Sequence, residues 1–182
     1  MSHSMNTNAL VRITAAFAIA LSYASLNGCA TPASPQAMAV SVDASIPQNP
    51  RLKNAITVGN IEGGQETNPL WTSQVDNASF REALIASMKS AGYLATDPSS
   101  AKYRLDAKLM SLIQPFMGLT LEVKSTVAYT VTAGKAAREH VITANGSGNF
   151  SDAVIAIERL KIANERSIKE NFIELFRQLM GY

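Results

Sequence analysis

The sequence predicts an α+β fold, a two-layer sandwich with the order β-α-β-β-β-α, in which a four-stranded, mostly antiparallel sheet carries two helices on one face. Residues 103–109 and 119–131 alternate apolar and polar side chains, as strands with one buried face do. Residues 77–91 and 152–180 repeat apolar side chains at helical spacing. Each element therefore has one apolar face, and two layers bury all of these faces.

The first half of the domain reads as a strand followed by a helix. Residues 55–61 predict the strand, which ends at Gly63. Asp76 predicts the N-cap of the helix 77–91, and Gly92 its end. The expected apolar face of this helix comprises Phe80, Leu84, Ile85 and Met88.

The next three strands are expected to form an antiparallel meander. The second strand runs from 103 to about 114, the third covers 119–131, and the fourth covers 136–144. Residues 145–148 are predicted to be a loose tail, with a second hairpin as the alternative because Asn-Gly favours hairpin turns. If the first strand pairs in parallel, its crossover should be right-handed.

The last helix is predicted from Asp152 to Met180, with Ser151 or Asp152 as its cap. Asn164 and Asn171 lie one heptad apart on its main apolar stripe. Buried amides need partners, so hydrogen bonds that fix the helix register are expected, with a polar ligand site as the alternative. The main stripe is Ile157, Leu160, Ile168, Phe172, Leu175 and Leu179. A second stripe, expected to be covered within the molecule, is Ile155, Ile162, Ile173 and Met180.

An apolar segment that ends at a cysteine precedes this domain. Leu26, Asn27 and Gly28 stand directly before Cys29, the only cysteine, and follow an uncharged apolar stretch that is too short to span a membrane. The pattern predicts a signal peptide over 1–28, recognised at Leu26-Asn27-Gly28, and a lipid on Cys29. An ordinary cleaved signal and an uncleaved anchor remain alternatives, and either Met1 or Met5 starts translation.

The residues after Cys29 indicate the destination and the spacing of the domain. Ala30 replaces the acidic residue that commonly retains lipoproteins in the inner membrane, so the periplasmic face of the outer membrane is expected. Residues 29–50, rich in Pro, Ser and Ala, predict a semi-rigid tether. Residues 51–182 then form a single domain.

Composition and motifs argue against several classes of function. The net charge of +2 gives no case for nucleic-acid binding. His140 is the one histidine after Cys29, which is too few for a zinc site or a hydrolytic triad. Glu62 and Glu66 read as solvated loop charges. No enzymatic activity, metal or cofactor is expected.

With this order of elements, the chain resembles the small outer-membrane lipoproteins of the YajG type and, more loosely, the lipopolysaccharide-assembly lipoprotein LptE. Besides the lipobox, the resemblance rests on Phe80-x-x-Ala83-Leu84, Gly92-Tyr93, Tyr103-x-Leu105, Val127-x-Tyr129-x-Val131, Arg159-x-x-x-Ala163-Asn164-Glu165 and Asn171. It implies a domain that binds other envelope components and has no catalytic residues.

Two functions follow as hypotheses. The first is a non-catalytic binding or assembly accessory of an envelope protein complex, held at the membrane by the lipid on Cys29, with its oligomeric state open. The alternative is a carrier or sensor of a small amphiphile or glycan bound between helices and sheet. Phe116, Met117 and Leu119, in the turn between the second and third strands, are the candidate partner contact. The competing reading is that they cap the open end of the core.

Overall fold

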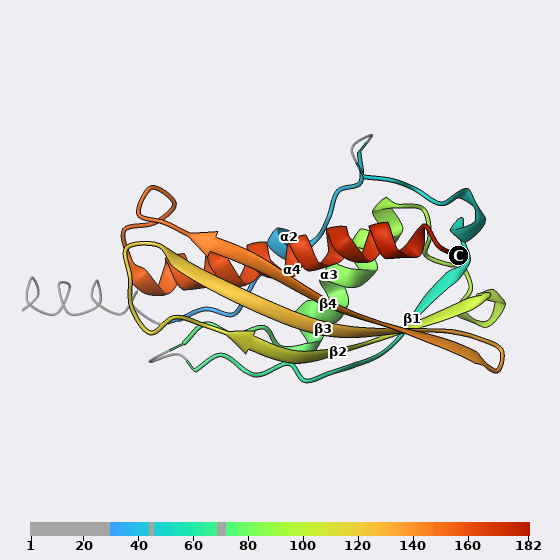
Figure 1. The fold of residues 1–182 in the computed structure, drawn as a ribbon, viewed down its shortest axis with the longest axis horizontal. Helices are drawn as coiled ribbons and strands as arrows, with labels where there is room; N and C mark the ends of the chain where they lie inside the picture. Colours follow the sequence, from blue (N-terminus) through green and yellow to red (C-terminus); the bar gives the residue numbers. More distant parts are fainter. Residues whose placement is uncertain (1–29, 44–45, 69–71) are drawn as a thin grey trace, which may run out of the picture.

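The computed structural model describes residues 30–43, 46–68 and 72–182, so the predicted signal peptide and Cys29 lie outside the described residues. The elements, in chain order, are α2 (Pro35–Met38), η1 (Pro50–Leu52), β1 (Ile56–Glu62), α3 (Asn77–Ser90), η2 (Pro98–Ser100), β2 (Tyr103–Ile113), β3 (Leu121–Ala133), β4 (Ala136–Gly148) and α4 (Ala156–Leu179). The predicted α+β sandwich is confirmed: the helices lie on one face of a four-stranded sheet (Figure 1).

The sheet has the strand order β1-β2-β3-β4. β1 pairs in parallel with β2, while β2–β3 and β3–β4 are antiparallel. One correction concerns the end of β4. The strand continues through the expected tail to Gly148, where Gly146 pairs with Val123, so both the loose tail and the second hairpin were wrong.

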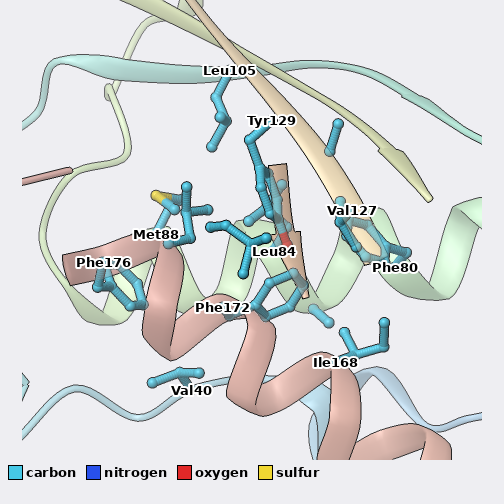
Figure 2. Packing of buried hydrophobic residues seen from close by; sticks show 14 of the residues in the cluster. Val40, Phe80, Leu84, Met88, Leu105, Val127, Tyr129, Ile168, Phe172 and Phe176 are labelled. Carbon is cyan, nitrogen blue, oxygen red and sulfur yellow. The ribbon is translucent and has the colours of Figure 1, made fainter. Parts of the chain in front are cut away.

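The core fills the space between the two layers (Figure 2). Phe80 of α3 and Phe172 of α4 meet edge to face, with ring centroids 5.1 Å apart. Tyr129 of β3 belongs to the same cluster and is fully buried. Val58 of β1 is half-buried. The following side chains of the sheet and the two long helices are buried: Ile56, Leu84, Leu105, Val127, Tyr129, Ile168, Phe172 and Leu175.

The start of α3 follows the local sequence pattern, whereas the start of α4 does not. Asp76 caps α3 as predicted, because its carboxylate accepts a hydrogen bond from the Ser79 amide at 2.8 Å. α4, by contrast, starts at Ala156 without a side-chain cap. Residues 149–154 form a turn instead, in which Asp152 accepts a hydrogen bond from the Asn149 amide.

The expected tether is part of the domain, which corrects the predicted boundary at residue 51. Ala33, Met38 and Val40 are buried in the main core, and α2 packs against both α3 and α4. The Val40 amide donates to Ser87 Oγ at 2.9 Å. These apolar side chains pack individually rather than along a regular face, so they left no periodic pattern in the sequence.

The second stripe of α4 is covered in part. Ile173 packs against the core and Ile162 is half-buried. Ile155 and Met180, at the two ends of the helix, are exposed, which contradicts the expectation that the whole stripe is covered. Across residues 30–43, 46–68 and 72–182, no helix combines the length and apolar character needed to cross a bilayer.

Candidate functional site

The turn between β2 and β3 projects from the end of the sandwich (Figure 1). Phe116 is 97% exposed, and Met117 and Leu119 are also exposed. The alternative that these side chains fold back as a cap over the core is therefore wrong. Water-exposed Phe, Met and Leu grouped in one turn are typical of a contact surface.

A second exposed apolar loop lies beside the first. Residues 149–155, which connect β4 to α4, expose Phe150, Val154 and Ile155. The buried Arg159 side chain connects the two loops, since its guanidinium donates to the carbonyls of Val154 at 2.7 Å and Gly118 at 3.4 Å. The two loops form one surface, the apolar end, comprising Phe116, Met117, Leu119, Phe150, Val154 and Ile155.

The apolar end contains little charge. Asp152 is the one charged residue in the sequence ranges 115–120 and 149–155. Its carboxylate accepts two hydrogen bonds from the Arg166 guanidinium, at 2.7 and 2.8 Å. The hydrogen bonds from Arg166 lower the pKa of Asp152 to about 2. This end of the molecule therefore presents apolar side chains and a neutralised carboxylate.

A buried polar network ties the N-terminal segment to the base of the apolar end. The carbonyl of Ser73 accepts hydrogen bonds from the Asn164 and Gln114 amides, both at 2.9 Å. Gln114 also donates to Asn164 Oδ1 at 2.9 Å. Ser73 Oγ in turn donates to the carbonyl of Thr31 at 2.8 Å. Residue 31 is thus held two hydrogen bonds away from Gln114, which directly precedes the turn.

Asn171 occupies a separate buried network. Its Oδ1 accepts a hydrogen bond from the Tyr129 hydroxyl at 2.8 Å, and its Nδ2 donates to the Ile142 carbonyl at 3.0 Å. Burial raises the pKa of the Tyr129 hydroxyl well above its usual value. Every polar atom of the amide is engaged within the domain, and the same holds for Asn164. This geometry leaves neither amide available as a polar ligand site.

Asn171→Ala is expected to reduce the free energy of unfolding by about 1–3 kcal/mol, because it leaves the Tyr129 hydroxyl buried without a partner. Chemical denaturation of the mature chain measures the loss. Tyr129→Phe is the matched variant, and the double variant should lose less than the sum of the two single losses. Strict additivity would show that the two side chains are not coupled.

The face of the sheet that bears no helix carries a shallow hollow of about 450 Å³. Met110 and Val141 are exposed at its lining, and Ala128 lies between them. Charged side chains surround these apolar residues, among them Lys108 and the Arg104–Asp106 ion pair. In this ion pair, Arg104 Nη2 lies 2.9 Å from Asp106 Oδ1. This combination was not anticipated from the sequence, because cross-strand neighbours become visible only with the register.

The remaining polar candidates are dispersed. The Nε2 atom of His140 is 2.7 Å from the Tyr182 hydroxyl, and partial burial lowers the pKa of His140. Glu62 and Glu66 are exposed. Within the described part of the chain, no three His, Cys, Asp or Glu side chains are grouped in a way that could hold a metal ion.

The comparisons with known proteins give no family. No protein-family model and no curated protein matches the chain, so the resemblance to lipoproteins of the YajG type stays a prediction. Solved structures with a related arrangement include a candidate lipoprotein of Caulobacter crescentus, with 15% identity, a TM-score of 0.49 and coverage of 72% of this chain and 91% of that one.

Two other solved structures are similar at the same level. A hypothetical protein of Chlamydia trachomatis has 12% identity and a TM-score of 0.45, covering 71% of this chain and 94% of that one. A protein of Xanthomonas campestris from a family of unknown function has 9% identity and a TM-score of 0.46, covering 75% of this chain and 94% of its own. Likenesses of this size transfer no function to this chain.

Proposed function

We propose that this protein is a lipid-anchored, non-catalytic binding or assembly accessory of an envelope protein complex, on the periplasmic face of the outer membrane. The lipobox at Leu26–Cys29 supports the anchor, and Ala30 supports the outer-membrane destination. The lipid on Cys29 is the contact with the membrane. The contact with a partner protein falls on the outer surface of the domain.

The observation that carries the binding role is the filled interior. Tyr129, Phe80, Phe172 and Phe176 occupy the space between helices and sheet and are fully buried. The largest of the described hollows lies on the opposite side, on the open face of the sheet. A small amphiphile or glycan would have to displace the packed core, which counts against the carrier alternative.

The open face of the sheet has the character of a protein-binding surface. Non-obligate interfaces combine a small apolar centre with a polar rim that stays hydrated. Met110 and Val141 supply the apolar centre, while Lys108, Glu139 and the Arg104–Asp106 pair supply the rim. We therefore assign the envelope protein partner to this face.

Cys29→Ser is expected to abolish labelling by a palmitate analogue and to leave unprocessed precursor, because the lipid is attached to the cysteine thiol. The wild-type protein should fractionate with the outer membrane, and Ala30→Asp should shift it inward in a host that uses the aspartate signal. Unchanged labelling of the Cys29→Ser variant would refute the anchor.

A photo-crosslinking amino acid at Val141 tests the partner face in cells. Val141 is 63% exposed, so the replacement leaves the fold intact. The matched control is the same amino acid at Lys169, an exposed position on α4 on the other side of the molecule. Protein adducts should form from position 141 and not from 169. Equal adduct formation at both positions, or none at 141, would refute the assignment.

A further inference from the structure

The apolar end needs an occupant other than water, and two features of the chain indicate which one. The first is where the described chain begins. Ala30 directly follows the predicted lipidated residue, and consecutive Cα atoms are about 3.8 Å apart. The hydrogen bonds from Thr31 through Ser73 to Gln114 hold this start of the chain beside the base of the turn that carries Phe116.

The second feature is the charge balance. Burying an unpaired charge in an apolar environment is costly. The two loops present none, because Asp152, their one charged residue, is bound by Arg166. Behind the loops, the buried Arg159 guanidinium donates to loop carbonyls and lies over the Phe150 ring, 5.5 Å from its centroid, while its Nε has no hydrogen-bond partner among the described residues. The apolar side chains of these loops can therefore reach the acyl chains without carrying an unpaired carboxylate with them.

We propose that the apolar end is inserted into the membrane leaflet that holds the lipid on Cys29, so that the lipid and the two loops together seat the domain on the bilayer. The proposal rests on the proposed lipidation of Cys29. The occupant is the lipid surface itself, because the described chain starts one residue after Cys29 and lies beside the base of the turn that carries Phe116.

The depth of insertion is limited by the backbone. Loop N–H and C=O groups need hydrogen-bond partners, which the hydrocarbon core does not offer. The side chains of Phe116, Met117 and Val154 therefore enter the boundary between headgroups and acyl chains, about 5–10 Å deep. The long strands then point away from the membrane, and the β3–β4 turn around Lys135 lies at the far end of the molecule (Figure 1).

The test uses the lipidated protein reconstituted in vesicles of phosphatidylethanolamine and phosphatidylglycerol. With Cys29 lipidated, the chain has no other cysteine, so one introduced cysteine carries an environment-sensitive fluorophore. Met117→Cys and Val154→Cys report the two loops, and Lys135→Cys is the matched exposed control. Nitroxide lipids labelled near the headgroup should quench the two loop positions about twofold or more beyond position 135.

Equal quenching at 117 and 135 would overturn the proposal, and so would quenching at only one of the two loops. Protein adducts in cells from a photo-crosslinker at Phe116, without lipid quenching, would assign the end to a protein partner and also overturn it. The anchor is measured separately by flotation with the vesicles. If the protein floats with the vesicles but position 117 is not quenched, the insertion of the apolar end is refuted and the anchor stands. If position 117 is quenched in protein that carries no palmitate label, the lipid anchor is refuted and the insertion stands.

Discussion

Phe172→Ala is expected to reduce the free energy of unfolding by about 3–5 kcal/mol, the usual cost of removing a large buried aromatic side chain. Phe172 has no exposed surface and contacts the Phe80 ring edge to face at an interplanar angle of 79°. The substitution leaves a cavity at the point where α4, α3 and the sheet meet. Chemical denaturation of the mature chain gives the loss directly.

Phe116→Ala is the matched control, because it makes the same chemical change at the most exposed phenylalanine of the domain. Its effect on unfolding should stay within about 0.5 kcal/mol. A loss below about 1 kcal/mol at Phe172 would mean that α4 is turned the wrong way on the sheet. A loss above about 1 kcal/mol at Phe116 would mean that this side chain folds back over the core after all.

Gly146→Ala is expected to reduce the free energy of unfolding by about 1–3 kcal/mol, as overpacking of a close contact does. A Cβ atom at this position would lie 2.2 Å from the Ser167 amide nitrogen and 2.4 Å from the Ala163 carbonyl oxygen. Both are backbone atoms of α4, so the helix itself has to move. Thermal and chemical denaturation both measure the effect.

Ser147→Ala is the control for Gly146→Ala. Ser147 is the next residue in β4, and its side chain is exposed. Its carbonyl, which accepts a hydrogen bond from Arg166, is unchanged by the substitution. Ser147→Ala should therefore leave stability unchanged. If Gly146→Ala were equally neutral, α4 would not lie as close to β4 as the structure places it.

The fold was predictable where apolar and polar side chains repeat at a regular spacing. Alternation in β2 and β3 and the apolar stripe of α4 identified the layers, and Asp76 and Gly92 fixed the ends of α3. Gly146 and Gly148 were assigned to a loose tail, because the role of both glycines depends on the close approach of α4 to the strand. That approach involves residues 11 to 21 positions away in the chain, from Gly148 to Arg159 and from Gly146 to Ser167, which no local pattern encodes.

The candidate site was predictable in part, because some of its residues form a local pattern in the sequence and others do not. Three apolar residues in a short turn stand out against the polar residues that turns usually carry, so Phe116, Met117 and Leu119 were found. Val154 and Ile155 were missed because they fell inside the helix predicted from Asp152, and Phe150 lay just before it. The two loops are united by the side-chain contacts of Arg159, at the N-terminal end of α4, which the sequence pattern does not reveal.

The distance between the domain and the bilayer shows whether residues 30–43 pack against the domain or act as a tether. Neutron reflectometry of the lipidated protein on a supported bilayer measures the water layer between headgroups and protein. If residues 30–43 pack against α3 and α4 as described, protein density begins directly at the headgroups. A water-filled gap of tens of Å, within the roughly 70 Å reach of an extended segment over residues 30–50, would contradict this arrangement.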